Sequence, residues 1–341
     1  MAIVGAFESL AEAQKLVRSE LLAGVVQETY EDGQLLQRLP VVVIDSLSLI
    51  YNREGTLPAA AFYDIHEQLP FSASTTLTQV TTNLKICARQ EILDGFMMKT
   101  YKTPNDYRTV ILSTLRKGVM RTIEDKLLYG NVDSDSAEFD GIGHLLPADI
   151  AGGETWAAAN TQAYDMGGAA VPVTMRVIRE LIDQVRPKPS ILLMTRTMRN
   201  TLSSTAFEKG IVLASARGGG ATYGADEFGR RVDYFDGIPI VISDYLLDET
   251  DNTVNKDSGN DSGISSIWAL RFGSIIDGGL TLCTGGDTGG MELFKLNEKP
   301  KLEDYPDTDG LELVAYVSLA QGSSKATAVI HSIDEDGVIV G

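Results

Sequence analysis

The strongest helical pattern in the chain lies in residues 105–129. Apolar side chains recur there every four residues, and the basic side chains lie mostly off that stripe. The stripe consists of Tyr107, Ile111, Leu115, Val119, Ile123 and Leu127. This period is typical of an amphipathic α-helix, with Pro104 at a tolerated start position and Gly130-Asn131 as a stop signal. At about 1.5 Å per residue, the pattern predicts a single helix roughly 40 Å long.

A second helix is predicted over residues 8–28, whose apolar positions also follow helical spacing. Ser9 followed by Glu12 fits a capping box at its start. The helix precedes every segment that has the pattern of a core. It is therefore either an arm that lies on a neighbouring subunit or a helix that packs on its own domain, and the sequence leaves both alternatives open.

Two extended segments lie between these helices. Residues 40–52 are rich in β-branched side chains and have no helical period, while residues 77–89 alternate, with Val80, Leu84 and Ile86 on one face. The segment between them, about two dozen residues, is too long for a tight turn, and loops of that length in compact domains are usually functional. The pattern predicts a long two-stranded arm with an irregular tip.

The second half of the chain mixes helices and strands. A helix is predicted over residues 173–186, then a short buried strand over 190–195, a further helix, and a turn followed by a strand within 235–244. Residues 249–263 are polar and read as a solvated loop. Strands are predicted over 266–272, 279–283 and 291–296, and two more close the chain. The fold class is α+β.

Length and composition fit a globular protein of about two domains at ~150 residues each. The chain has 341 residues, of which 43% are hydrophobic and 22% charged. Its two cysteines are too few for a disulfide framework or a structural zinc site, which fits a reducing compartment. No stretch approaches the ~18 apolar residues of a membrane span. The N-terminus lacks the basic leader of a secretory signal.

The chain is strongly acidic, with a formal net charge of −18. That charge argues against a protein that reads DNA sequence through a basic surface. The acidity is uneven, because residues 85–131 hold nine bases and five acids, a local +4, which leaves −22 for the rest. One basic stretch therefore stands out, and it includes the predicted long helix.

Residues that could carry chemistry do not assemble into a known motif. The histidines His66, His144 and His331 are each solitary in sequence, and no G-x-S-x-G elbow occurs. Residues 218–224 are glycine-rich but lack the Lys-Ser/Thr of a phosphate-binding loop, so a turn is expected. Residues 133–135 and 307–310 lack the full ligand set of a calcium loop and are expected to be solvated turns. Cys87 and Cys283 lie in predicted strands as packing residues. No catalytic residue, cofactor or metal site is predicted.

Four sequence segments carry a resemblance to a known family. They are LLYGN…FDGIGHLLP (127–147), SILLMTRTMRNTLSS (190–204), FDGIPIVISD (235–244) and LVAYVSLAQGSSKATAVIHSI (313–333). With the preceding arm and long helix, this order resembles the major capsid proteins of tailed bacteriophages, the Hong Kong 97-like fold. The resemblance covers residues 40 to 333 and rests on spacing and residue type.

The resemblance implies a domain plan. Residues 1–39 would be an N-terminal arm and 40–90 an extended loop. Residues 91–154 would be a peripheral domain with the long helix as its spine, 155–285 an axial domain, and 286–341 the strands that complete the peripheral domain. The implied function is structural: several hundred copies close an icosahedral shell around viral double-stranded DNA, without enzymatic activity.

The same resemblance implies two sets of interface residues. The extended loop would overlap a neighbouring subunit through Arg53, Glu54, Asp64, His66 and Glu67. The spine helix would face the shell interior with Arg108, Arg116, Lys117, Arg121 and Lys126. An isolated two-stranded hairpin is marginal in water, so an overlapping arm gains stability from its neighbour. Few phosphate contacts on an acidic protein imply weak, salt-sensitive DNA contact.

The implied partners are other copies of the chain, in hexamers and pentamers, with a portal and decoration proteins. No long charged helical region precedes the arm, so a separate scaffolding protein is expected, with self-nucleation as the alternative. No membrane contact is expected, and the location is the virion, assembled in the host bacterial cytoplasm. Some members of this fold are cross-linked through a lysine near the loop tip. Here no lysine occurs in residues 16–84, so no such cross-link is expected.

Two alternatives stay open. An encapsulin-type compartment has the same fold and encloses protein cargo, although the long arm and the chain length favour the viral shell. A cytosolic two-domain α+β enzyme belongs to a different class. Size distinguishes them, because an enzyme is a monomer or small oligomer whereas a shell protein forms capsomers or megadalton particles.

Overall fold

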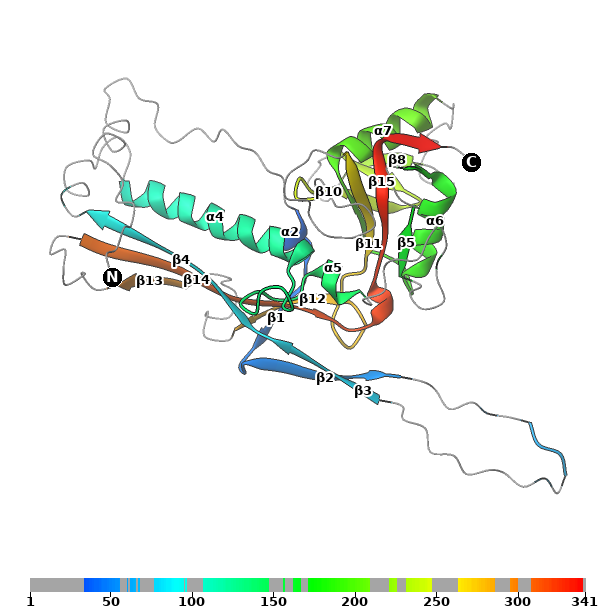
Figure 1. Ribbon diagram of the computed structural model, residues 1–341, viewed down its shortest axis with the longest axis horizontal. Helices are drawn as coiled ribbons and strands as arrows, with labels where there is room; N and C mark the ends of the chain where they lie inside the picture. The colour runs from blue at the N-terminus through cyan, green and yellow to red at the C-terminus, as the bar shows by residue number, and fades with distance from the viewer. Residues whose placement is uncertain are drawn as a thin grey trace.

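The computed structural model describes residues 34–55, 60, 62–65, 67, 77–94, 96, 107–146, 156, 162–166, 171–208, 221–225, 231–246, 263–285, 295–299 and 308–339. Within these residues the strands form a five-stranded, an eight-stranded and a two-stranded sheet. The two larger sheets lie side by side, and the two-stranded sheet extends away from both as an arm (Figure 1). The helix predicted over 8–28 and most of the polar loop at 249–263 lie outside the described residues.

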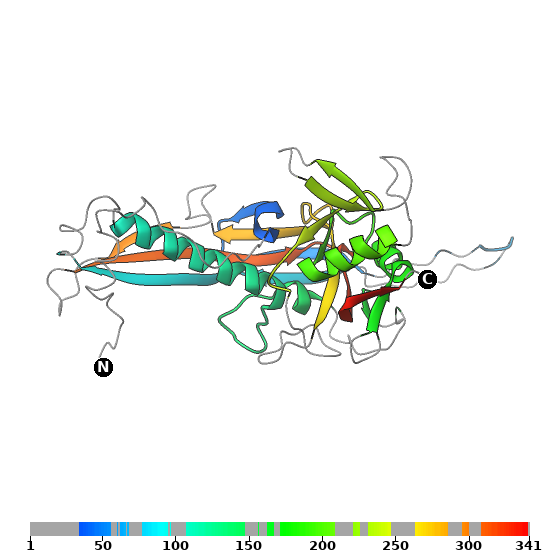
Figure 2. The ribbon, with the colours of Figure 1, turned by 90° about the horizontal axis from the view of Figure 1, so that it is seen from above.

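Strand β14 (Thr308–Gln321) is the centre of the five-stranded sheet. It pairs antiparallel with all three of its neighbours, which are β4 (Lys85–Asp94), β12 (Leu280–Gly285) and β13 (Lys295–Lys299). The short strand β1 (Val41–Ile44) adds to β12 in parallel. Helix α4 (Tyr107–Tyr129) runs along β4 and β14 (Figure 2).

Helix α4 confirms the predicted long helix, and its apolar stripe explains how it packs. At 3.6 residues per turn, a four-residue repeat advances by about 40° per step, so the stripe turns about 160° from Ile111 to Leu127. The exposed fraction along it falls from 9% at Ile111 to 0% at Leu127. The N-terminal half therefore packs on the sheet, while the C-terminal half is also enclosed by α2 (Leu35–Arg38) and α5 (Ile142–Leu145).

A buried carboxylate joins α2 to this helix. Glu124 of α4 is 4% exposed, and its Oε1 accepts a hydrogen bond of 2.9 Å from the backbone nitrogen of Leu36. The first N–H groups of any helix lack partners within that helix, and here Glu124 supplies one. No described helix is long and apolar enough to cross a membrane.

The eight-stranded sheet forms the second lobe, with α6 (Met175–Gln184) and α7 (Arg196–Glu208) packed against it. Its strand order is β5-β15-β11-β7-β10-β9-β8, and β6 also pairs with β15. The strands are β5 (Ala163–Asp165), β6 (Val171–Thr174), β7 (Ile191–Met194), β8 (Ala221–Ala225), β9 (Arg231–Phe235), β10 (Ile238–Ile242), β11 (Ile264–Leu270) and β15 (Thr327–Ile339). Every residue of β7 and β11 is buried, so these two strands form the centre of the core.

The elements predicted in this lobe are confirmed. α6 begins after Thr174, whose hydroxyl oxygen accepts a hydrogen bond from the backbone nitrogen of Val177, as an N-cap does. Asp236 and Gly237 connect β9 to β10 with φ angles of 47° and 75°. A two-residue hairpin turn of this kind needs positive φ at both positions, which Asp-Gly tolerates.

The strand pairing crosses the expected segment boundaries at four strands. β1 and residues 85–90 of β4, expected in the extended loop, pair in the five-stranded sheet. β12, expected in the axial domain, pairs in the five-stranded sheet, while β15, expected to complete the peripheral domain, pairs in the eight-stranded sheet. β12 is buried over its whole length, and β15 is buried on both faces from Thr327 to Ile333. A strand without alternation fits either sheet by pattern alone, so the sequence does not say which one it joins.

Three local predictions are wrong. Residues 308–310 were expected in a solvated turn, but they open β14 and pair with β4. Residues 221–224, part of the turn expected over 218–224, instead lie in β8, which pairs with β9. The segment 77–89 is two strands, β3 (Leu77–Asn83) and β4, because the backbone nitrogen of Leu84 binds the Leu47 carbonyl at 3.0 Å between them. Ile86 consequently leaves the predicted apolar face and is 67% exposed.

The packing of α4 can be tested with two substitutions in the same helix. Ile123→Ala removes a fully packed side chain and should lower the free energy of unfolding by about 2–5 kcal/mol. Gly118→Ala is the control, because an added Cβ meets no atom within 4 Å. It should raise stability by about 0.5–1 kcal/mol, since glycine is unfavourable inside a helix. Denaturant unfolding measures both, and equal effects of the two changes would contradict the packing described.

Candidate functional site

The arm is the most exposed regular structure in the described part of the chain. β2 (Ser48–Glu54) and β3 pair antiparallel from Ser48–Asn83 to Glu54–Leu77. No third described strand joins them. Apolar side chains stand in solvent along the arm, with Ile50 56% and Leu77 62% exposed. A two-stranded sheet of this kind is marginal by itself, so its root and tip decide what it can do.

The arm is fixed to the end of β14 at Tyr51 and Arg53 of β2, which form its root. The Tyr51 hydroxyl donates to the Gln321 carbonyl at 2.7 Å, and Arg53 Nε donates to the Gly322 carbonyl at 3.1 Å. A second nitrogen of the Arg53 guanidinium also donates to the Gln321 carbonyl. The guanidinium carbon lies 5.8 Å from the centroid of the Tyr51 ring. Two side chains of β2 thus hold two successive carbonyl groups.

Those carbonyl groups belong to the junction between the two large sheets. The junction consists of residues 321–326, which lead from β14 through a 3₁₀ turn (η2, Ser324–Ala326) into β15, and residues 271–279, which lead from β11 to β12. The backbone nitrogen of Gly322 binds the Gly279 carbonyl at 3.0 Å, and that of Arg271 binds the Ala326 carbonyl at 2.9 Å. A side chain at Gly322 would overlap the Ile275 carbonyl. The two segments that connect the sheets, 321–326 and 271–279, are therefore closely packed against each other.

The tip of the arm displays apolar side chains on a closed turn. Phe62 is 105% exposed and Ile65 85% exposed. The Glu67 carboxylate accepts from the Asp64 backbone nitrogen at 3.0 Å, and the Glu67 nitrogen donates to the Asp64 carbonyl at 3.1 Å. These bonds hold the turn that carries Ile65. Exposed aromatic and aliphatic side chains in a preformed turn are suited to insertion into another surface.

The structure places the predicted loop residues in different parts of the arm. Arg53 is engaged within its own chain at the root, and Glu54 is exposed at the end of β2. Asp64 and Glu67 meet at the tip turn. His66 lies outside the described residues. Sequence reasoning missed Phe62, Ile65 and Tyr51, although an apolar run in a polar loop is a signal that points to the first two.

The predicted basic residues all lie on α4 but do not share one face. At about 100° per residue, Arg116, Lys117 and Arg121 fall within an arc of roughly 140°, and Arg108 and Lys126 lie outside it. Lys126 is ion-paired with Glu138 of the following turn. Any common basic surface on this helix therefore rests on the three central residues.

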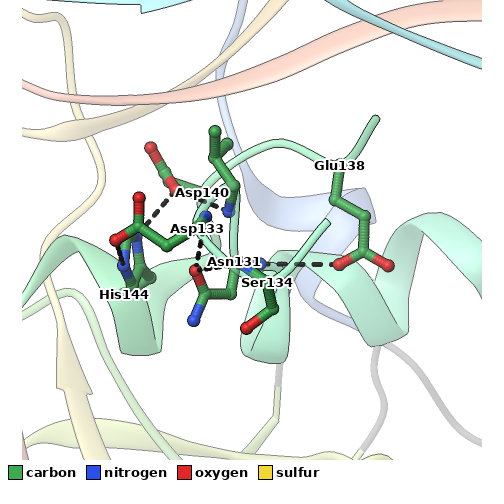
Figure 3. A network of polar contacts seen from close by, with 7 residues as sticks. Asn131, Asp133, Ser134, Glu138, Asp140 and His144 are labelled. Carbon is green, nitrogen blue, oxygen red and sulfur yellow. Dashed lines mark hydrogen bonds and ion pairs between the residues drawn. The ribbon is translucent and has the colours of Figure 1, made fainter. Parts of the chain in front are cut away.

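The turn after α4 contains the polar network of Figure 3. His144 Nδ1 lies 2.7 Å from Asp140 Oδ1, and Nε2 lies 3.2 Å from Asp133 Oδ2. Asp140 also accepts from the Val132 nitrogen at 3.2 Å, and the Asn131 side chain accepts from the Asp133 nitrogen at 2.8 Å. The two carboxylates bind opposite ring nitrogens and do not converge on one point. Within the described residues no group of three metal-ligating side chains occurs.

Two glycines allow the backbone segments of that turn to lie close together. The Gly141 nitrogen donates to the Gly130 carbonyl at 2.9 Å, and a Cβ at Gly141 would lie 2.6 Å from the Lys126 carbonyl oxygen. Backbone segments approach here more closely than any side chain permits. Lys85 of β4 donates to the Ser136 carbonyl at 2.6 Å and ties the turn to the sheet. The network is structural, and the four-residue spacing of Asp140 and His144 is the signal that could have revealed it.

Both cysteines lie among apolar side chains. Burial raises the pKa of Cys283 to about 11 and also raises the pKa of Cys87. The thiolate is the reactive form of cysteine, so these thiols are poor nucleophiles near neutral pH. Cys283 packs with Ile44 and Ala320 beneath the arm root, and Cys87 packs against the core under α4. They occupy packing positions in two strands of the five-stranded sheet.

Comparison with known proteins gives matches among solved structures. No family model and no curated protein matches the sequence. The SrpI encapsulin of Synechococcus elongatus PCC 7942 matches with a TM-score of 0.67 and 14% identity, covering 98% of this chain and 99% of that one. The capsid of cyanophage A-1(L) matches with a TM-score of 0.62 and 10% identity, over 94% and 98%. The capsid of a native GTA particle matches with a TM-score of 0.60 and 13% identity, over 93% and 94%.

The chain therefore has the α+β fold of phage capsid and encapsulin subunits, over nearly its whole length. This is the fold that the sequence resemblance predicts. The matches span almost all of both chains.

Proposed function

We propose that this chain is the major capsid protein of a tailed bacteriophage, which assembles from many copies into an icosahedral shell around double-stranded DNA. One observation carries the proposal. The chain combines a whole-length shell-protein fold with an arm whose tip side chains, Phe62 and Ile65, have no packing partner among the described residues. An arm of this kind gains its stability on another copy of the chain, in hexamers and pentamers.

The physical basis of assembly is the apolar surface of the arm. Burial of apolar surface contributes about 25 cal/mol per Å², so two large side chains at each contact stabilise it by a few kcal/mol. Polar pairs at the rim, such as those of Glu54, Asp64 and Glu67, are each worth roughly 0–1 kcal/mol. A closed shell repeats every contact many times, so individually weak interfaces suffice.

Contact with packaged DNA is expected to be weak. The net charge of −18 opposes close approach of phosphate, and Arg116, Lys117 and Arg121 of α4 supply the positive surface that would face the genome. Such binding is independent of sequence and weakens with salt. A separate scaffolding protein, a portal and decoration proteins complete the proposed assembly, which forms in the host bacterial cytoplasm.

An encapsulin-type compartment is the second candidate. The observation that favours it is the match to the cyanobacterial encapsulin, with a TM-score of 0.67 over 98% of this chain. The two proposals differ in what the particle encloses. Particles from the native host that protect double-stranded DNA from nuclease support the capsid, whereas particles that hold a folded protein cargo and no DNA support the compartment.

The role of the tip can be tested by shortening the arm. Replacement of residues 56–76 by a short glycine-serine turn should leave a folded subunit that fails to form stable particles. Ile65→Ser with Phe62→Ser should weaken assembly in the same direction. Ile276→Ser is the matched control, because Ile276 is 97% exposed but lies at the junction. Sedimentation velocity measures the particle fraction, and normal particles from the shortened chain would contradict the proposed role of the arm.

A second test concerns covalent cross-linking between subunits. No lysine occurs in residues 16–84, which include the arm tip, and Lys85 is the first residue of β4, where its side chain donates to the Ser136 carbonyl. An isopeptide bond needs an amine close to a carboxyl or amide group. Mature particles boiled in SDS should therefore run as one band near 36.8 kDa. A ladder of multimers that survives reductant would show that another lysine forms the link.

A further inference from the structure

We propose that Tyr51 and Arg53 couple the arm to the junction between the two large sheets, so that arm direction and the angle between the sheets change together. The two side chains hold the arm in a fixed direction relative to Gln321 and Gly322 of the same chain. The inference concerns the free chain, so it stands or fails independently of the proposed shell function.

The geometry of the contact is directional. Tyr51 and Arg53 are two residues apart on β2 and therefore lie on the same face of the strand. They donate three hydrogen bonds to the carbonyl oxygens of Gln321 and Gly322. The guanidinium is a planar fork with donors in fixed directions, so it specifies the orientation of both carbonyl groups as well as their distance. Rotation of the arm about its root cannot leave these bonds intact unless residues 321 and 322 rotate with it.

Gln321 connects this contact to the second sheet. Its carbonyl binds the arm, while its side-chain Nε2 donates to Thr327 Oγ1 at 3.0 Å. Gln321 is the last residue of β14 and Thr327 is the first residue of β15. Gln321 is 1% exposed and Thr327 0% exposed, so water does not compete for this bond. A continuous chain of contacts thus runs from Arg53 through Gln321 to the eight-stranded sheet.

Close packing makes the junction resistant to local adjustment. A Cβ at Gly322 would lie 2.8 Å from the Gly278 Cα, and a Cβ at Gly279 would lie 2.6 Å from the Gly273 Cα. Gly278 has a φ of 76°, which side-chain-bearing residues rarely adopt. Densely packed backbone transmits a displacement to its neighbours because it has no free volume in which to absorb it. Movement of residues 321–322 therefore displaces residues 271–279, the other crossing between the sheets.

The position of the contact on the arm makes the coupling mechanically useful. The seven paired residues of β2, at about 3.4 Å each, make the paired part of the arm roughly 24 Å long, and Tyr51 and Arg53 are the fourth and sixth of them. A force on the tip therefore reaches the junction through these two residues. Binding of the tip to another molecule would thus change the angle between the two large sheets, and a change in that angle would turn the arm.

Hydrogen exchange on the unassembled full-length chain tests this coupling in both directions. Arg53→Gln removes the charged fork, and Thr327→Val removes the far end of the chain of contacts with little change of shape. Arg53→Gln should speed exchange in peptides covering 271–281 and 318–328 on the order of tenfold, as loss of a charge-assisted hydrogen bond predicts. Thr327→Val should speed exchange in peptides covering 48–54 and 77–83, because coupling is reciprocal. Glu54→Gln, an exposed neighbour on β2, is the control and should change neither region.

If Tyr51 and Arg53 only hold the arm in place, without coupling it to the junction, the exchange pattern is different. If Arg53→Gln speeds exchange only within 48–83, or if Thr327→Val leaves the arm unchanged, the coupling is contradicted. Should Arg53→Gln fail to fold, Tyr51→Phe removes a single hydroxyl donor and gives the same comparison. A chain that forms no particles can still show the coupling, so failure of the shell proposal and failure of this inference are distinguishable.

Discussion

Strand β14 is the element on which the rest of the five-stranded sheet and helix α4 depend. β4, β12 and β13 all pair with it, and α4 packs across it. The backbone carbonyl of its last residue, Gln321, accepts a hydrogen bond from the arm, and the Gln321 side chain donates to Thr327 of the eight-stranded sheet. Backbone hydrogen bonds of a central strand are protected from water on both sides. The strand therefore provides a rigid base from which a marginal two-stranded arm can extend.

The contrast between root and tip explains how such a subunit is suited to assembly. At the root, Tyr51 and Arg53 are fixed by hydrogen bonds to the junction. At the tip, Phe62 and Ile65 remain in solvent on a turn that Asp64 and Glu67 hold in shape. A preorganised tip loses little conformational entropy on binding, so more of its apolar burial stabilises the contact. In the proposed shell, this rigid support and these exposed side chains would let the arm bind a neighbouring copy.

Much of the fold is predictable from the sequence, for identifiable physical reasons. The stripe of α4 and the turn at Asp236-Gly237 are local signals, and both are confirmed. Strand pairing is not local. β12 and the first half of β15 are buried on both faces, so nothing in their pattern assigns either to its sheet. Arg53 shows the same limit, since it lies between exposed polar residues and binds a carbonyl 268 residues away. The candidate site is thus predictable as an arm, while its anchorage is not.

Cryo-electron microscopy of the purified chain tests most directly whether the arm is completed by other copies of the chain, as proposed. We expect closed shells of icosahedral symmetry in which Phe62 and Ile65 are buried against a neighbouring subunit. A monomer or small oligomer, or a shell in which both side chains remain in solvent, would contradict it.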